Sequence, residues 1–222
     1  MKKFFILIAV IALACSASAQ EVKEKATQTP KSPEIVQLQL ANQLAKYGYE
    51  VESPTALIEA ARIMVETPTQ QFDGQYTRGE GKDVAAPNGN SAITPEQLLA
   101  DARKMADGDK TVLALADQVN PNTVTRGAVN GPRRGTYRIY GGSTDSYVVA
   151  FKKGILAEVA VAGAGNSDLD LYIYDENGNI ITYDEDYSDD CYVSWYPRWT
   201  GNYLIRVVNR SRYSNAYTII TN

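Results

Sequence analysis

The chain has 222 residues with 22 basic and 26 acidic side chains, and its formal net charge is −4 at pH 7. Histidine is absent, which excludes Ser-His-Asp triads and the common zinc sites. The acidic balance argues against nucleic acid as a partner, because binding to phosphates depends on clustered basic residues.

Residues 1–19 have the pattern of an export signal peptide. Two lysines precede an apolar run over residues 4–14, and Ala17-Ser18-Ala19 is a small-x-small cleavage site. Cys15 raises the alternative of a lipid-modified cysteine, although Ala12 stands where such sites usually have leucine. No second apolar run is long enough to span a bilayer. We therefore expect a periplasmic or secreted protein that is cleaved near Ala19.

Residues 20–33 are polar and charged, which predicts a flexible tether. A helical period begins at Glu34, and residues 34–120 are predicted to form a small region of four amphipathic helices. Ser53, Thr94 and Asp109 are the expected caps of the second, third and fourth helices. The expected buried stripe of the first helix is Val36, Leu40, Leu44 and Tyr47, with Gly48 as its end. That of the second helix is Leu57, Ala60, Ala61, Met64 and Val65. Residues 67–91 form a long polar loop to which the sequence assigns no role.

Residues 121–135 are rich in proline and glycine and are predicted to be a linker. Eight short strands separated by turn residues follow in residues 136–222, a pattern typical of an antiparallel, jelly-roll-like β-sandwich. The predicted fold class is therefore α+β, with a small helical N-terminal region and a C-terminal sandwich. Cys191 is the one cysteine left after signal cleavage, so no intramolecular disulfide is expected, and its expected role is that of a small buried apolar residue.

The hairpin from Asp168 to Asp190 carries the most distinctive pattern. Strict alternation places Leu169, Leu171 and Ile173 on one face and Asp168, Asp170, Tyr172 and Tyr174 on the other. A two-residue Asn177-Gly178 loop would set Leu171 opposite Asp184, a core residue against a charge. We expect instead a three-residue Glu176-Asn177-Gly178 loop with Gly178 left-handed, which pairs Ile173 with Ile181 and Leu171 with Tyr183. That register stacks Asp170 opposite Asp184 and Asp168 opposite Asp186.

Opposed like charges destabilise a sheet, and no lysine or arginine lies between Gly154 and Pro197 to balance them. Calcium, which prefers carboxylate and carbonyl oxygens, is the simplest remedy. The predicted calcium ligands are Asp168, Asp170, Asp184, Asp186 and Asp189. The alternative is that these aspartates are solvated turn and edge residues that keep the sheet from aggregating.

Twelve of the 15 tyrosines and both tryptophans lie after residue 136. Rings exposed on a sandwich face can stack on sugars or contact a polymer, whereas ordinary strand formers would be buried. The candidate polymer-binding residues are Tyr172, Tyr174, Tyr192, Tyr196 and Trp199. A third interpretation is a carboxylate-dependent hydrolase with Asp184 and Asp186 as acid and base, although the sequence has no separate nucleophile constellation.

Three motifs carry a family resemblance: Asp168-Leu169-Asp170-Leu171-Tyr172-Ile173-Tyr174-Asp175, Trp199-Thr200-Gly201-Asn202-Tyr203-Leu204-Ile205-Arg206-Val207-Val208-Asn209, and Asn215-Ala216-Tyr217-Thr218. With them, the last third of the chain resembles the bacterial pre-peptidase C-terminal domain. The resemblance implies a small jelly-roll-like sandwich of secreted enzymes, often peptidases, in which some members bind calcium or a polymeric substrate. It places Asp168 and Asp170 at the family's acidic strand position, and Gly201 and Tyr203 at its Gly-x-Tyr strand start.

The helical region before the sandwich resembles no known family and carries no peptidase or metalloprotease motif. The resemblance therefore does not imply proteolysis. We predict an exported, non-catalytic binding or accessory protein with an acidic calcium-type site. Its predicted partner is an extracellular or envelope polymer or protein.

Overall fold

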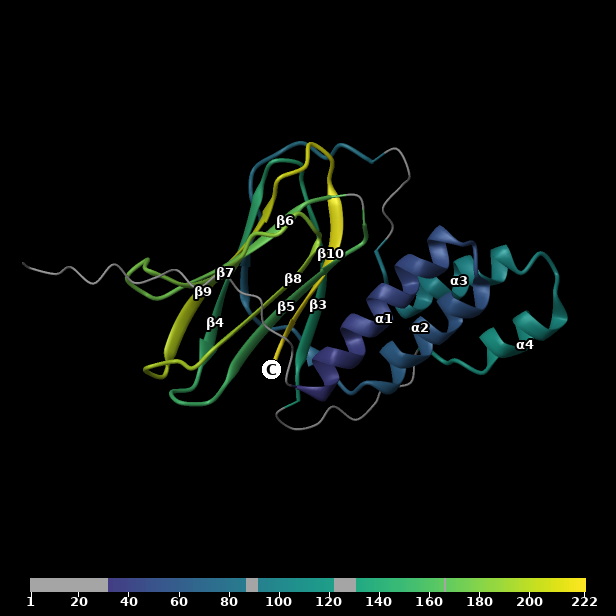
Figure 1. The fold of residues 1–222 in the computed structure, drawn as a ribbon, viewed down its shortest axis with the longest axis horizontal. Helices are drawn as coiled ribbons and strands as arrows, with labels where there is room; N and C mark the ends of the chain where they lie inside the picture. Colours follow the sequence, from purple (N-terminus) through teal and green to yellow (C-terminus); the bar gives the residue numbers. More distant parts are fainter. Residues whose placement is uncertain (1–31, 87–91, 122–130, 166) are drawn as a thin grey trace, which may run out of the picture.

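The computed structural model describes residues 32–86, 92–121, 131–165 and 167–222 (Figure 1). Helices lie at one side of the molecule and a two-layer β-sandwich at the other, which confirms the predicted α+β class. The predicted signal peptide, residues 20–31 of the tether and residues 122–130 of the linker lie outside the described residues. None of the described helices is both long and apolar enough to cross a membrane.

Four helices begin where the sequence supplies caps. They are α1 (Pro33–Glu50), α2 (Pro54–Glu66), α3 (Pro95–Met105) and α4 (Lys110–Asp117). Ser53 Oγ accepts a hydrogen bond from Ala56 N, and Thr94 Oγ1 accepts one from Gln97 N. Asp109 Oδ1 accepts from the two backbone amides at the start of α4. Each satisfies amides that have no partner inside the helix, so these three predicted caps are confirmed.

The predicted buried face of α1 is wrong except at Leu44, which is partly buried against the helical core. Val36, Leu40 and Tyr47 are 44%, 53% and 56% exposed, and the helix continues through Gly48 to Glu50. The buried residues are instead Ile35, Leu38, Ala41, Asn42, Ala45 and Gly48. Most of them are small, which lets the helix approach its neighbours closely. At Gly48 an added Cβ would lie 2.7 Å from Leu57 Cδ2 of α2, so this glycine serves helix packing and not helix termination.

The sandwich consists of two five-stranded sheets. In spatial order the first contains β1 (Gln70–Gln71), β3 (Arg133–Ile139), β10 (Asn215–Thr221), β5 (Ala157–Gly163) and β8 (Asp190–Trp195). The second contains β2 (Gln75–Thr77), β4 (Thr144–Phe151), β9 (Gly201–Asn209), β6 (Leu169–Tyr174) and β7 (Ile180–Asp184). The strands β3 to β10 match the eight strands predicted from the sequence. Their alternate side chains meet between the sheets in one apolar core, which includes Leu171, Ile205 and Val193.

The long polar loop after α2 was not predicted to contain strands, but it contributes one to each sheet. β1 pairs in parallel with β3, and β2 pairs antiparallel with β4. Phe72, between them, is buried in the core of the sandwich. The segment therefore joins the helices to both layers of the sandwich.

The β6–β7 hairpin has the predicted loop but not the predicted register. Gly178 is left-handed with φ +82°, and Asp175 N donates to Asn179 O, as a three-residue loop requires. A bulge then follows: Tyr174 pairs with Ile180, whereas Ile173 pairs with Thr182. The bulge leaves Ile181 unpaired and sets Leu171 opposite Asp184, so the predicted pairs of Ile173 with Ile181 and Leu171 with Tyr183 are wrong.

The helices pack on the outer face of the β1-β3-β10-β5-β8 sheet (Figure 1). Ala160, Tyr192 and Ile220 of this sheet belong to the same apolar cluster as the buried faces of α1, α2 and α3. A polar contact accompanies this apolar packing: Asn42 Nδ2 of α1 donates a hydrogen bond to Gly163 O of β5 at 3.2 Å. The two parts of the chain therefore share a core.

Candidate functional site

The outer face of the β2-β4-β9-β6-β7 sheet points away from the helices (Figure 1), and we refer to it as the open face. Because side chains alternate along a strand, the residues between the core positions of β6 and β9 lie on this face. On β6 these are Asp170, Tyr172 and Tyr174, and on β9 they include Leu204 and Arg206. Strand pairing sets Tyr172 beside Arg206 and Tyr174 beside Leu204.

Three tyrosine rings form a row on the open face. The ring centroid of Tyr172 lies 6.3 Å from that of Tyr174 and 6.1 Å from that of Tyr183, with interplanar angles of 29° and 20°. Tyr172, at the centre, is buried, whereas Tyr174 and Tyr183 are half-buried. The bulge at Ile181 creates this row, because it brings Tyr183 opposite Tyr172 on the outer side of the sheet.

Two arginines flank the tyrosine row. The guanidinium of Arg206 lies 5.0 Å from the centroid of the Tyr174 ring, a distance at which a cation is attracted to the ring face. Arg210 Nε lies 2.5 Å from Asp170 Oδ2, and Arg210 Nη2 donates to Tyr172 Oη at 2.8 Å. The side chain of Arg210 is half exposed, so its charge remains accessible beside the row.

The hydroxyl of Tyr172 is the centre of a polar network. It lies within hydrogen-bonding distance of Asp170 and Glu185 as well as Arg210. Burial, followed by the hydrogen bond to Glu185, raises the pKa of Tyr172, so the hydroxyl keeps its proton at neutral pH. The open face therefore combines half-buried rings with fixed donors and acceptors.

The structure separates the predicted calcium ligands. Asp184 is buried and accepts a hydrogen bond from Tyr192 N of β8 at 3.0 Å, which satisfies a backbone amide of the other sheet. Burial raises the pKa of Asp184 in spite of that bond. Asp186 is exposed and accepts from Ser188 N at 2.9 Å. The carboxylate of Asp170 is held by Arg210, so the counter-charge that the hairpin lacks comes from the β9–β10 turn.

Asp189 belongs to the contact between the helices and the sandwich. Its Oδ1 lies 2.6 Å from Lys46 Nζ of α1, and the same ammonium lies 2.8 Å from Asp190 Oδ2. The other carboxylate oxygen of Asp189 accepts from Gly165 N and Asn215 Nδ2. Burial lowers the pKa of Lys46, but the charges of Asp190 and Asp189 outweigh it and the pKa is raised. Lys46 is therefore charged throughout the physiological range.

Asp168 has an acceptor oxygen that no described residue uses. Its Oδ1 is buried without a hydrogen-bond partner in the described part of the chain, and burial together with the charge of Asp170 raises the pKa of Asp168. Among the described residues, no three or more carboxylate, thiol or imidazole groups are grouped as a metal site. The five predicted ligands thus do not converge on one point in this arrangement. Calcium binding stays a prediction, and it now centres on Asp168.

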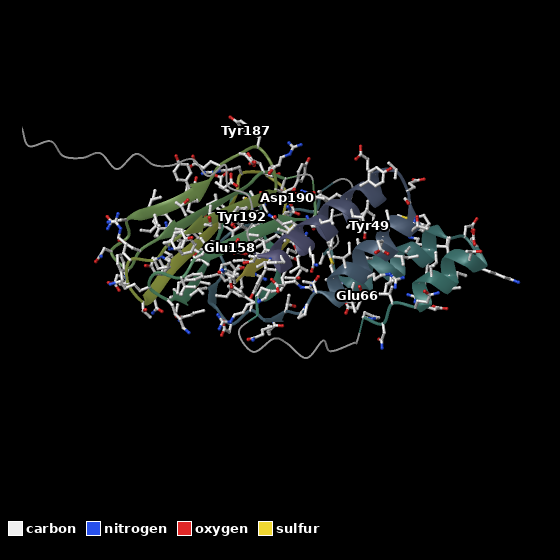
Figure 2. All side chains as sticks on the ribbon, turned by 60° about the horizontal axis from the view of Figure 1, so that its bottom comes forward. Tyr49, Glu66, Glu158, Tyr187, Asp190 and Tyr192 are labelled. Atoms are coloured by element: carbon white, nitrogen blue, oxygen red, sulfur yellow. The ribbon has the colours of Figure 1, made fainter. Side chains whose placement is uncertain are left out.

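The five candidate polymer-binding aromatic residues lie in three different parts of the structure. Tyr172 and Tyr174 lie on the open face. Tyr192 is buried beneath α1, where its hydroxyl donates to Glu158 Oε1 at 2.6 Å, and Figure 2 shows both residues where the sheet meets the helices. This burial removes Tyr192 from any polymer-binding surface. Tyr196 and Trp199 lie in the β8–β9 turn at the end of the sandwich, where the Trp199 ring stacks on Tyr203.

Sequence reasoning missed Tyr183, Arg206 and Arg210 as residues of the candidate face. Alternation along β9 places Arg206 on the outer side of that strand, but the pairing of β9 with β6 cannot be read from local pattern. Arg210 lies 40 positions from Asp170 in the chain. Tyr183 was assigned to the inner side by the predicted register, which the bulge shifts by one residue.

No protein-family profile matches the chain. Among solved structures it is similar to a mitogen derived from Yersinia pseudotuberculosis, at 15% identity and a TM-score of 0.36 over 41% of this chain and 85% of that one. It is also similar to a periplasmic inhibitor of g-type lysozyme from Aeromonas hydrophila, at 16% identity and a TM-score of 0.34 over 41% of this chain and 84% of that one. A third similar structure is the pre-peptidase C-terminal domain of a Bacillus anthracis collagenase, at 16% identity and a TM-score of 0.32 over 41% of this chain and 88% of that one. The β-sandwich that the expected resemblance implies is present in the structure. Membership of the pre-peptidase C-terminal family stays a prediction.

Proposed function

We propose that this protein is an exported, non-catalytic binding module whose open face binds a polysaccharide chain of the cell envelope or the extracellular space. The observation that carries the proposal is the row of Tyr174, Tyr172 and Tyr183 on the sheet face that points away from the helices. Sugar rings present apolar C–H faces together with hydroxyl groups. A surface that combines aromatic rings with fixed polar groups matches both features.

The polar groups beside the row suit a neutral or acidic glycan. Arg206 and Arg210 supply planar sets of N–H donors, which bind hydroxyl and carboxylate oxygens in defined directions. Glu185 is exposed and supplies acceptors next to Tyr172. The row of rings extends over the two paired strands β6 and β7, which favours a polymer that contacts several subsites along its length over a single small sugar.

The test is affinity electrophoresis of the full chain against a panel of soluble polysaccharides, followed by calorimetry on those that retard it. Tyr174→Ala and Tyr183→Ala are each expected to weaken binding at least about tenfold, the effect of losing a central aromatic contact. The matched control is Tyr47→Ala, which removes a tyrosine that is 56% exposed on α1 and far from the face. The proposal would be refuted if Tyr174→Ala and Tyr183→Ala both bound the polysaccharide as the unchanged protein does. It would also be refuted if Tyr47→Ala weakened binding as much as they do.

Calcium is a second proposal, supported by the unpartnered Oδ1 of Asp168 beside Asp170 and Asp186. An ion there would have to share Asp170 with Arg210 or displace it. If Ca²⁺ binds the folded state alone, it should stabilise the protein by about 2.7 kcal/mol at about a hundredfold excess over its dissociation constant. Thermal melts in EDTA, Ca²⁺ and Mg²⁺ should then show a calcium-specific rise that Asp168→Asn abolishes. An unchanged melting temperature, or a rise that persists in Asp168→Asn, would remove this site.

A further inference from the structure

Two turns meet at the end of the sandwich farthest from the β7–β8 and β9–β10 turns. The β4–β5 turn (152–156) and the β8–β9 turn (196–200) lie side by side there (Figure 1). Gly154 N donates to Pro197 O at 2.8 Å, and Lys153 N donates to Thr200 Oγ1 at 3.0 Å. These bonds tie the two turns into one surface, which we refer to as the basic tip.

The basic tip exposes apolar side chains that the fold leaves without cover. Ile155 and Tyr196 are each 62% exposed, among the highest values for large apolar residues in the described part of the chain. Trp199, half-buried, stacks on Tyr203 with ring centroids 5.8 Å apart and backs the tip. The tip thus presents one aliphatic and one aromatic side chain to solvent.

The same tip concentrates positive charge on a chain whose net charge is −4. Lys152, Lys153 and Arg198 are all exposed, and none of the three forms an ion pair with an acidic side chain in the described part of the chain. The neighbouring β6–β7 turn brings two opposing charges to this end, Asp175 and Glu176, and both act on Tyr203. The three basic side chains of the tip outnumber these two acidic ones, whereas the opposite end carries Asp168, Glu185 and Asp186 together with Arg210 and Arg212.

We infer that the basic tip docks the protein on an anionic lipid bilayer. Lysine and arginine near such a surface are attracted to its negative potential, and tyrosine and tryptophan prefer the headgroup level. Ile155 decides between a membrane and a soluble anionic polymer, because an aliphatic side chain gains free energy by entering the acyl boundary and gains little from a sulfated or carboxylated chain. With the tip seated on the bilayer, the open face of the sheet would stand beside the membrane surface and stay accessible.

The experiment is co-sedimentation of the full chain with vesicles of equimolar phosphatidylglycerol and phosphatidylcholine, against vesicles of phosphatidylcholine alone. Binding is expected only to the anionic vesicles and should weaken with added salt. Lys152→Gln with Lys153→Gln should lower the partition coefficient about 25-fold, since each basic residue near the surface contributes about fivefold. Ile155→Ser with Tyr196→Ser should lower it at least about tenfold.

Matched controls separate the tip from general effects. Lys104→Gln with Lys110→Gln removes two exposed lysines from the helices, and Leu40→Ser with Tyr47→Ser removes two exposed apolar residues from α1. Both control variants should bind vesicles as the unchanged protein does, as should Tyr174→Ala on the open face. The inference is overturned if anionic vesicles are not bound. It is also overturned if the apolar tip variant binds normally, or if dextran sulfate is bound while vesicles are not.

Discussion

Asp145 is a fully buried carboxylate inside the sandwich. Its Oδ2 accepts hydrogen bonds from Tyr217 Oη at 2.9 Å and Tyr76 Oη at 3.1 Å, and its Oδ1 accepts from Gly79 N. Burial raises the pKa of Asp145 even though these three bonds lower it. The residue therefore fastens the segment after α2, which carries Tyr76 and Gly79, to β4 and, through Tyr217, to β10 of the other sheet.

This burial predicts a pH dependence of stability. Because the pKa of Asp145 is higher in the folded chain than in the unfolded chain, the folded state binds the proton more tightly. Between the raised pKa and the ordinary carboxyl value near about 4, its contribution to the free energy of unfolding should rise as pH falls. Urea unfolding of the unchanged protein and of Asp145→Asn, from neutral pH downward, should show the unchanged protein gaining stability relative to the variant. Equal pH profiles would contradict the assignment.

At the scale of elements, α1 has two apolar faces, and only one is buried. Leu38 is 2% exposed and Leu40 is 53% exposed, two positions apart on the same helix. Leu38→Ala should lower the free energy of unfolding by about 2–5 kcal/mol, the cost of truncating a core leucine. Leu40→Ala should change it by no more than about 0.5 kcal/mol. Chemical denaturation of both variants measures the difference, and equal effects would mean that the buried face has been assigned incorrectly.

The contact of α1 with β8 includes an ion pair that is only partly exposed. Lys46→Met would leave Asp189, which is mostly buried, without its cation, and we expect a loss of about 1–3 kcal/mol in the free energy of unfolding. This loss is smaller than the loss expected on breaking a fully buried ion pair, because the side chains of Lys46 and Asp190 are 24% and 31% exposed. Arg62→Met, which breaks the more exposed pair with Glu59, is the control and should cost no more than about 1 kcal/mol. Equal losses in the two variants would show that Lys46 does not anchor the helix.

At the scale of the whole molecule, the shared core predicts cooperative unfolding. Both tryptophans, Trp195 and Trp199, lie in the sandwich, whereas the helices dominate the circular dichroism at helical wavelengths. Urea unfolding followed by tryptophan fluorescence and by circular dichroism should give one coincident transition, because Ala160, Tyr192 and Ile220 pack with the helices. Two separated transitions would show that the helices unfold independently of the sheet.

Local chemistry in the sequence determined the elements of this protein. Alternation along β3 to β10 and the caps Ser53, Thr94 and Asp109 depend on neighbours within a few positions, so they could be predicted. The three-residue loop with left-handed Gly178 could also be predicted, because Asp175 Oδ1 accepts from the turn amides of Asn177 and Asn179.

The tertiary structure decided what those elements face. The bulge at Ile181 sets the register, and in that register Asp184 accepts from Tyr192 N of the other sheet, a partner outside the hairpin. The buried side of α1 depends on the small residues that meet α2 and the sheet, and not on the largest apolar stripe. Arg210 reaches Asp170 across a long stretch of chain, and α1 covers Tyr192 but leaves Tyr174 open. Each of these outcomes depends on a contact between distant residues, and local periodicity carries no information about which distant residues meet.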